Sequence, residues 1–457
     1  MFDREEETLM RVAENINQGF KSSDIDEYIK SGISLGKKKK RRAKMRMYTS
    51  VVALFTFIML ITSIRISPAF AYYVSKVPGF NYIVKLINYD KGIKDAVDNN
   101  FVEEINASQE HDDIAFTIKD IIIDNSKAII FYSIENKGDH RFVNLHSVSF
   151  KDEKGKELTF AGAAWACFTN KDMNVYKKLE ESVELNFPEE TKIPETLLIS
   201  IKLKESKEEA YSNNSEEVLP FTWDFKIPID NKKFQDMSKK YALNKNIEVE
   251  GQIITFKNLT ITPTRMALEI EYDKNNTKKI LGFDDIEIVD ENGENRSTIN
   301  GISGTKIDDY NEIIYFQSNY FSNPKELYIK GSSIRALDKD KCTVEIDIEN
   351  NKLLKAPDDK FILSSVNKTD KELILDYKVI SNDPKDKNNH YNSFYNEIKD
   401  SNGKVYQEYR SSSIVGSSLE NNTTSFITID NEIKSPIYLN IYNYPARIKG
   451  DFKVKVK

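Results

Sequence analysis

The chain has 457 residues, of which 39% are hydrophobic and 30% are charged, and its formal net charge is −6. This length predicts about three domains with enough apolar residues for several cores. Residues 1–46 contain 12 Lys and Arg against 8 Asp and Glu, so the rest of the chain carries a net charge of −10. Direct nucleic-acid binding is therefore not expected of that larger part, because no basic surface outweighs its acidic background.

The chain offers few residues for metal binding or catalysis. Its two cysteines, Cys167 and Cys342, cannot form a disulfide framework, so we expect the domains to depend on hydrophobic cores. The four histidines lack metal-ligand spacing. The common nucleophile, phosphate-loop and dinucleotide motifs are absent as well. We therefore expect no enzyme activity, no cofactor and no metal site.

Residues 1–46 are predicted to form a short helical cytoplasmic tail. Leu9, Val12, Ile16 and Phe20 recur at spacings of three and four, and acidic residues precede them at the helix start. Two interpretations remain open for this apolar stripe. It binds a groove in a partner protein, or it lies on the inner leaflet of a membrane.

A basic cluster and an apolar run follow the tail. The apolar run Met47–Ile64 covers roughly 27 Å as a helix, close to the hydrocarbon thickness of a bilayer. With the basic residues on its N-terminal side, residues 47–71 are predicted to be the transmembrane segment of a single-pass cell-membrane protein with a cytoplasmic N-terminus. The alternative is a signal peptide cleaved after Ala71. The basic residues would set this topology and contact anionic lipid; they are Lys37, Lys38, Lys39, Lys40, Arg41, Arg42, Lys44 and Arg46.

The C-terminal part is predicted to be extracellular and mainly β. Residues 72–111 are expected to form a helical segment, with an amphipathic helix over Tyr82–Val97. From about Asp112 onward, apolar and polar residues alternate with a period of two, which indicates strands. A repeat of strands, turns and Pro residues then predicts three immunoglobulin-like sandwiches in tandem. Their expected ranges are residues 112–230, 231–355 and 356–457.

Each predicted sandwich contains an Asp-x-x-Gly turn and ends in a closing strand. The turns are Asp152–Gly155, Asp290–Gly293 and Asp400–Gly403, and hairpins favour these residue types. A calcium loop is the less favoured interpretation, because the last acidic ligand is missing. The expected closing strands are Phe221–Ile227 in the first unit, Thr343–Ile348 in the second and Phe452–Val456 in the third.

Several short segments resemble a bacterial membrane-anchored family defined by domain of unknown function 4179. They are the basic run with the span, Ser67–Ala71, Val77–Phe80 and Asp90–Ile93, and the strands that follow look similar to about Glu135. Residues 244–347 resemble a second uncharacterised β-domain that often accompanies it. The resemblance implies an anti-sigma-factor-like role beside extracytoplasmic-function sigma factors in Gram-positive bacteria. The zinc-type signature His-x-x-x-Cys-x-x-Cys is absent from residues 1–46, so any sigma contact would use helices without metal.

These observations predict a membrane-anchored regulator. Its tail would bind an extracytoplasmic-function sigma factor, and its β-sandwich region would sense the envelope. The alternative is a cell-surface structural or adhesive protein without a signalling role. Both readings leave open a cell-wall or extracellular ligand for the β region.

Overall fold

The computed structural model describes residues 3–19, 90–160, 162–165, 172–188, 191–207, 216–234, 237–298, 302–381, 383, 386, 393–415, 420–429 and 432–457. The chain divides into two compact units, Met1–Val84 and Lys85–Lys457. In the first unit the described element is helix α1 (Asp3–Gly19). The second unit begins with helix α5 (Lys91–Asp98) and is otherwise built mainly of strands.

The described helices correct the predicted fold class and localisation. Among the residues that the structure describes, no helix is long and apolar enough to cross a membrane. Helix α1 has seven charged residues among its 17, and the eight residues of α5 extend only about 12 Å, against about 30 Å of hydrocarbon. The transmembrane helix and the single-pass membrane localisation with an extracellular β region are therefore not supported, and the fold is mainly β with short helices. The predicted span, Met47–Ile64, lies outside the described residues.

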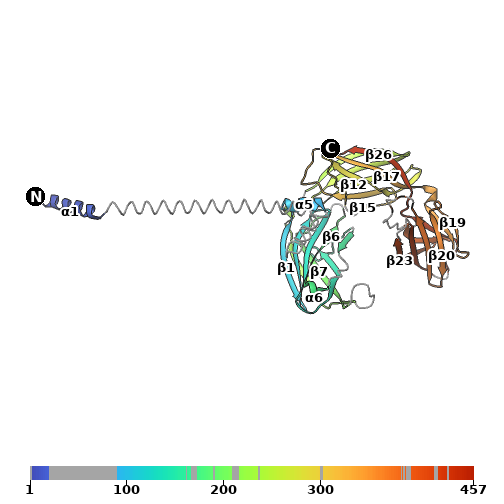
Figure 1. Cartoon of the computed structure of the whole chain (residues 1–457), viewed down its shortest axis with the longest axis horizontal. Helices are drawn as coiled ribbons and strands as arrows, with labels where there is room; N and C mark the ends of the chain where they lie inside the picture. Colours follow the sequence, from blue (N-terminus) through green and yellow to red (C-terminus); the bar gives the residue numbers. More distant parts are fainter. Residues whose placement is uncertain are drawn as a thin grey trace. The chain divides into compact units, whose positions relative to one another are not determined.

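The first module is a sandwich of two sheets. One sheet has the order β1-β2-β3-β6-β5, and in the other β7 pairs with β4, β8 and β9. The orders β2-β3-β6-β5 and β4-β7-β9 correspond to the two sheets of an immunoglobulin constant-type sandwich. Figure 1 shows this module in blue and green. Its elements are β1 (Glu103–His111), β2 (Ile114–Ile123), β3 (Lys127–Asn136), β4 (Phe142–Lys151), β5 (Gly162–Trp165), α6 (Met173–Tyr176), β6 (Lys178–Asn186), β7 (Thr196–Ser206), β8 (Glu216–Val218) and β9 (Trp223–Pro228).

Strand β1 lies inside the 72–111 range for which a helical segment was expected. Its residues alternate between half-buried and exposed, and it pairs antiparallel with β2. In the sequence the only sign of this strand is that Ile105 and Ala107 stand two residues apart between polar residues. Among the described residues of this range, the helix is α5, which begins at Lys91 after the N-cap Asp90.

The middle module repeats the same strand order. Its larger sheet has the order β10-β11-β12-β16-β15, and in its second sheet β17 pairs with β13, β14 and β26. A short helix, α7 (Asn231–Phe234), precedes it. Its elements are β10 (Lys239–Val249), β11 (Gln252–Ile261), β12 (Arg265–Tyr272), β13 (Lys278–Phe283), β14 (Glu287–Asp290), β15 (Ser303–Lys306), β16 (Asn311–Gln317), β17 (Leu327–Asp338) and β26 (Arg447–Lys455).

The third module is one continuous sheet of eight strands. Its order is β19-β18-β25-β22-β23-β24-β21-β20. The first residues of β23 pair with β22 and its later residues pair with β24, so this strand joins the two halves of the sheet. A 3-10 turn, η1 (Lys339–Lys341), precedes it. Its strands are β18 (Thr343–Asp347), β19 (Lys352–Lys355), β20 (Phe361–Lys368), β21 (Glu372–Ile380), β22 (Phe394–Asp400), β23 (Val405–Val415), β24 (Glu420–Thr428) and β25 (Ile437–Ile441).

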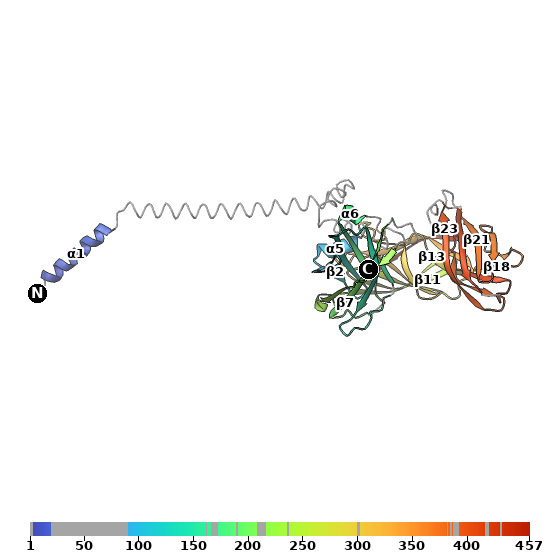
Figure 2. The ribbon, with the colours of Figure 1, turned by 90° about the horizontal axis from the view of Figure 1, so that it is seen from below.

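The closing strands of the middle and third modules are exchanged. Strand β18, expected to close the middle module, pairs with β25 of the third module. Strand β26, expected to close the third module, pairs with β17 of the middle module, and Figure 1 shows the C-terminus beside these strands. Figure 2 shows β18 in the same group of strands as β21 and β23 of the third module. The third module is therefore an insertion between β17 and β26. By contrast, β9 pairs with β7 within the first module, as its position in the sequence suggested.

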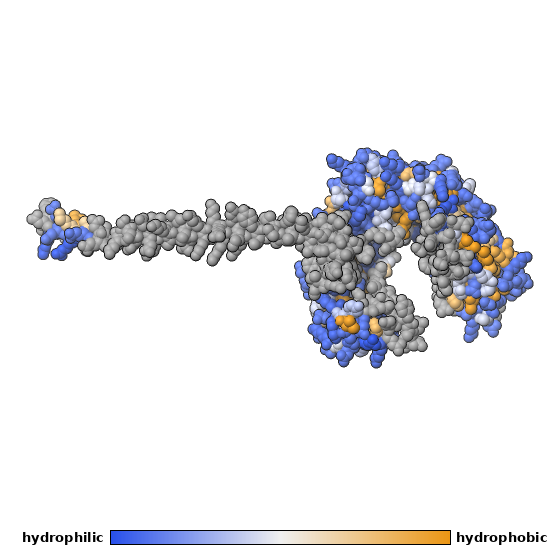
Figure 3. All heavy atoms as spheres, in the orientation of Figure 1, coloured by the Kyte–Doolittle hydropathy of each residue, from blue (hydrophilic) through white to orange (hydrophobic). Residues whose placement is uncertain are grey.

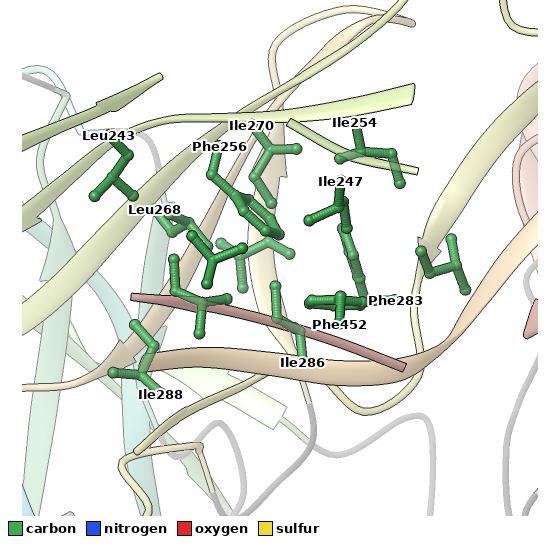
Figure 4. Packing of buried hydrophobic residues seen from close by; sticks show 14 of the residues in the cluster. Leu243, Ile247, Ile254, Phe256, Leu268, Ile270, Phe283, Ile286, Ile288 and Phe452 are labelled. Atoms are coloured by element: carbon green, nitrogen blue, oxygen red, sulfur yellow. The ribbon is translucent and has the colours of Figure 1, made fainter. Parts of the chain in front are cut away.

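The contacts of Phe452 show that β26 contributes to the hydrophobic core of the middle module. Its ring lies 5.8 Å from that of Phe256 and 6.1 Å from that of Phe283. Figure 4 shows Phe452 beside Phe283 in this core, near Ile286. Ile448 and Val454 of β26 are buried in the same cluster. The C-terminal strand therefore supplies three apolar side chains to a core that begins some 200 residues earlier at Leu243.

The three Asp-x-x-Gly turns have the same local geometry. Asp152 Oδ1 accepts hydrogen bonds from the N–H groups two and four residues later, both at 2.9 Å. Asp290 and Asp400 do the same at 2.8 and 2.9 Å. The glycines of the three turns adopt φ values of +80°, +79° and +81°. These carboxylates therefore cap tight turns, which is the interpretation favoured from sequence.

Candidate functional site

The apolar stripe of α1 is exposed on the described part of the helix. Leu9 is 69% exposed, Met10 66% and Val12 49%. In Figure 3, apolar residues gather on one side of α1 and hydrophilic residues on the other. The described helix has five acidic residues against Arg4 and Arg11, a net charge of −3. Such a helix presents a hydrophobic strip with an acidic surround, which suits a protein groove with a basic rim better than an anionic lipid surface.

The other predicted interaction residues fall outside what the structure describes. Ile16 lies on α1, but its side chain is not among the described ones, and Phe20 lies outside the described residues. The basic cluster Lys37–Arg46 is also outside the described residues. The structure thus places Leu9 and Val12 on one helix and leaves the rest of the predicted site as a prediction.

Helix α5 docks on the middle module, and sequence reasoning missed this site. The Asp90 carboxylate caps the helix by accepting hydrogen bonds from the N–H groups of Gly92 at 2.8 Å and Ile93 at 3.0 Å. Burial is the largest influence on Asp90 and raises the pKa of its carboxyl group. Because residues 91–98 make barely two turns, tertiary contacts rather than helix propensity must hold them.

Those contacts come from the end of β16 and the turn after β14. The Lys91 N–H donates to Gln317 Oε1 at 2.9 Å, and Lys91 Nζ lies 2.8 Å from Glu294 Oε1. A Cβ atom on Gly92 would lie 2.4 Å from the backbone nitrogen of Ser318, so only glycine allows this close approach. The Asp90–Ile93 segment, which carried part of the family resemblance, is thus a capped and tightly docked helix start.

A partly buried ion pair completes the dock. Arg296 Nη1 lies 2.8 Å from Asp95 Oδ2 and also donates to the Ser318 carbonyl at 2.9 Å. The Arg296 side chain is only 8% exposed. Truncating one partner of such a pair leaves an uncompensated buried charge, which makes the contact specific even where its net contribution is small.

A second set of polar contacts joins the first and middle modules near this dock. Asp124 Oδ2 accepts a hydrogen bond from the Thr264 N–H at 2.8 Å, and both residues are only 1% exposed. Arg265 Nη1 donates to Asn186 Oδ1 at 2.9 Å, and its guanidinium lies 4.0 Å from the centre of the Tyr315 ring. No spacing in the sequence pairs these residues, since they lie some 80 to 140 positions apart. The contacts fix the turn between β2 and β3 and the end of β6 against the middle module.

The third module is fixed to the middle module where the chain crosses back. Arg447, the first residue of β26, has its Nε atom 2.6 Å from Asp284 Oδ2. Its two terminal nitrogens donate to the two carboxylate oxygens of Asp386 at 2.9 and 2.6 Å. The Asp386 side chain is fully buried. Bidentate pairing of this kind fixes orientation as well as distance.

The remaining singled-out residues have structural environments. Trp223 is fully buried in the first module, where His111 lies 5.4 Å from its ring. Cys342 is half-buried, and burial raises the pKa of its thiol. Cys167 and His390 lie outside the described residues. Within the described part of the chain, no group of three or more His, Cys, Asp and Glu side chains has the arrangement of a metal site.

His140 takes part in an ion pair at one end of the first module. Its Nδ1 lies 2.9 Å from Glu205 Oε2, and its Nε2 lies 2.8 Å from the Asp112 carbonyl oxygen. Both partners are acceptors, so this geometry requires a proton on each ring nitrogen. Burial is the largest influence and lowers the pKa of His140, but the hydrogen bonds and charges of Glu205 and Asp112 together raise it above its ordinary value.

The fold and these contacts define a modular β-sandwich protein whose N-terminal α1 exposes an apolar stripe and whose α5 is docked on the middle module. Residues 40–136 match the model of a domain of unknown function, DUF4179. Residues 238–353 match that of a family of unknown function, DUF5643. The two family regions predicted from the residues are therefore confirmed, and α5 of the first region docks on the second.

Other comparisons add little. No curated protein sequence matches the chain. A solved structure described as the crystal structure of the conserved domain protein from Bacillus anthracis is similar over 56% of this chain and 84% of that chain, with 17% identity and a TM-score of 0.36. A similarity this low supports no functional statement.

Proposed function

We propose that this protein is an anti-sigma-factor-like regulator whose helix α1 binds an extracytoplasmic-function sigma factor. The observation that carries the proposal is the exposed apolar stripe of α1, in which Leu9 is 69% and Val12 49% exposed. The match of residues 40–136 to DUF4179 is consistent with an anti-sigma-factor-like family. An amphipathic helix bound in a groove uses apolar anchors at these spacings.

The β modules would act as the regulatory part. Helix α5 is the described element that follows the N-terminal unit, and the middle module holds it through Gln317, Arg296 and Glu294. Release of α5 from the middle module would change the position of the chain segment that is covalently joined to its N-terminal end. Hypothetically, a ligand that binds the β modules differently in the docked and undocked states would bias α1 toward or away from its partner.

The test is capture of candidate extracytoplasmic-function sigma factors by the full chain. Leu9→Asp and Val12→Asp should each weaken capture by roughly 30-fold, corresponding to about 2 kcal/mol for an interface anchor. Glu7→Gln, on the polar side of the same helix, is the matched control and should leave capture within a factor of two or three of the parent chain. If the parent chain captures no sigma factor, or if the Asp variants capture it as well as Glu7→Gln does, the proposal fails.

A further inference from the structure

The two open edges of the middle sandwich differ. On one side, β10 and β26 are in contact, since a Cβ atom on Gly450 would lie 3.1 Å from Val249 Cγ1 and the Lys449 N–H donates to Glu250 at 2.9 Å. On the other side, β15 ends its sheet, and Ser303, Gly304 and Thr305 are exposed. Edge strands with unpaired backbone groups are the places where another strand can join a sheet.

The hydrogen-bond pattern shows which groups of β15 point outward. The Ile307 N–H donates to the Asn311 carbonyl at 2.9 Å, so these two residues form a hydrogen-bonded pair. Because hydrogen-bonded and non-bonded pairs alternate along an antiparallel ladder, the next residues of β15 that bond to β16 are Thr305 and Ser303. The intervening residues, Gly304 and Lys306, therefore direct their N–H and C=O groups away from β16. Among the described contacts, none satisfies these groups.

A cavity lies beside this edge. It has a volume of about 250 Å³, enough for one large side chain, and is lined by Ile302, which directly precedes β15, by β16 and by the segment Asp284–Glu287. Ile286, Ile314 and Phe316 supply its apolar lining. Ile302 and Ile307, at the two ends of β15, are 39% and 63% exposed. The site combines a free strand edge with a side-chain pocket, as peptide-binding sheet edges do.

The charges around the cavity select the occupant. Its lining includes Asp284, Asp285 and Glu287 and contains no Lys or Arg. Asp284 is paired with Arg447, and Asp285 accepts hydrogen bonds from the N–H groups of Ser332 and Ser333. Glu287 has no cationic partner among the described residues. A side chain with an aliphatic stem and a positive end matches this combination, because the stem can lie on the apolar lining while the charge reaches the carboxylates.

We propose that the edge of β15 binds an extended segment of a partner protein as an added strand, with a Lys or Arg side chain of that segment in the cavity. The backbone groups of Gly304 and Lys306 supply the pairing, and the carboxylate-lined cavity supplies the preference for a basic residue. This site lies in the second unit and is independent of the role proposed for α1.

The experiment uses the full chain and three capped octapeptides, Thr-Val-Thr-Lys-Thr-Val-Thr-Asn and the same sequence with Leu or Glu in place of Lys. Isothermal titration calorimetry should show the Lys peptide binding at least tenfold more tightly than the Glu peptide. Hydrogen exchange should show protection of residues 302–307 on binding. If no peptide binds at millimolar concentration, or if the Leu or Glu peptide binds as well as the Lys peptide, the proposal is overturned.

Two pairs of variants separate the contribution of backbone pairing to peptide binding from that of the charge at the cavity. Lys306→Pro removes the outward N–H, whereas Lys306→Ala keeps it; binding should fall at least tenfold in the first and stay within threefold in the second. Glu287→Lys should weaken binding of the Lys peptide at least tenfold, whereas Glu248→Lys, at an exposed site on β10, should not. Exchange protection of β16 serves as the folding control. Protection of 302–307 that rises with protein concentration alone would instead assign the edge to a second copy of this chain.

Discussion

The first module is built from one continuous stretch of chain, whereas the middle module is completed by β26, a strand that follows the inserted third module. In the first module β9 follows β7 in the chain and pairs with it directly. In the middle module the next strand in the chain after β17 is β18, but β18 pairs with β25 of the third module, and β17 pairs instead with β26. Two covalent crossings, between β17 and β18 and between β25 and β26, therefore join these modules. The comparison indicates that the first module has a self-contained strand set, while the middle module depends on a strand that the chain supplies only after the third module.

Deleting residues 447–457 should have the largest effect on this comparison. The deletion removes Ile448, Phe452 and Val454 from the core of the middle module, and each loss of such a side chain costs roughly 2–5 kcal/mol. Their sum approaches the whole stability of a typical domain, so the middle module should unfold. Hydrogen exchange of β17 and β12 would measure this unfolding. Continued protection of both strands would show that the middle module folds without β26.

The same deletion should leave the first module folded, which its tryptophans can report. Trp165 and Trp223 both belong to β strands of that module, and the chain has two Trp in all. The tryptophan fluorescence transition in denaturant should therefore shift little. A large shift would show that the first module depends on the middle one through contacts such as Asp124 with Thr264.

Single substitutions on β26 and β9 should have a smaller effect and compare the stability of the middle module with that of the first. Phe452→Ala on β26 should destabilise the middle module by about 3–5 kcal/mol, because its ring is buried against Phe256 and Phe283. Phe225→Ala on β9 should cost a similar amount in the first module alone, where Phe225 lies 5.9 Å from Phe116. Denaturant unfolding followed by tryptophan fluorescence and by exchange of β17 distinguishes the two. Equal responses of both probes to both variants would argue for one cooperative unit throughout.

Substitution of the glycine in each Asp-x-x-Gly turn should lower the free energy of unfolding by a similar amount in all three modules. Replacing Gly155, Gly293 or Gly403 by Ala forces a side chain into a left-handed backbone conformation, at a cost of about 1 kcal/mol each. No atom lies within 4 Å of the added Cβ in any of the three, so backbone strain is the only expected term. Chemical denaturation of the three variants measures this. A much larger loss at one turn would show that it has a further role there.

The smallest effect should be a pH dependence confined to the first module. Because the folded-state pKa of His140 is raised, the stabilisation from its contacts with Glu205 and Asp112 is fully present below the ordinary pKa of about 6.5. It is lost as the pH rises through the folded-state value. Stability measured by tryptophan fluorescence should therefore fall over that range in the parent chain and much less in His140→Asn. A decrease of the same size in both would assign the pH dependence to other groups.

Much of the local structure could be predicted from residue patterns. The apolar run Ala128–Ile134 and the period of two in Ala267–Tyr272 and Leu373–Val379 predict strands, which the structure shows as parts of β3, β12 and β21. The capping residue Asp90 and the turn residues Asp290 and Gly293 act through neighbours only two to four positions away. Short-range geometry of this kind depends little on the rest of the fold.

The interaction sites were less predictable. The apolar spacing of Leu9 and Val12 indicates a helix face without indicating what covers it. The dock of α5 joins Asp95 to Arg296, and the module contacts join Asp124 to Thr264, at separations of 201 and 140 residues. The one available signal was the Asp90–Ile93 segment, which carried part of the family resemblance. The expectation of a membrane span was not supported by any described helix.

By itself, the sequence determined many of the strands, the buried face of those that alternate and the positions of the three turns, because these properties depend on alternation and on local capping. It also determined the two matched family regions, at residues 40–136 and 238–353. Only the tertiary structure decided which sheet β18 and β26 join. Alternation specifies the buried face of a strand but not its neighbour, and the free edges of β17 and β25 can each accept an antiparallel strand of this pattern.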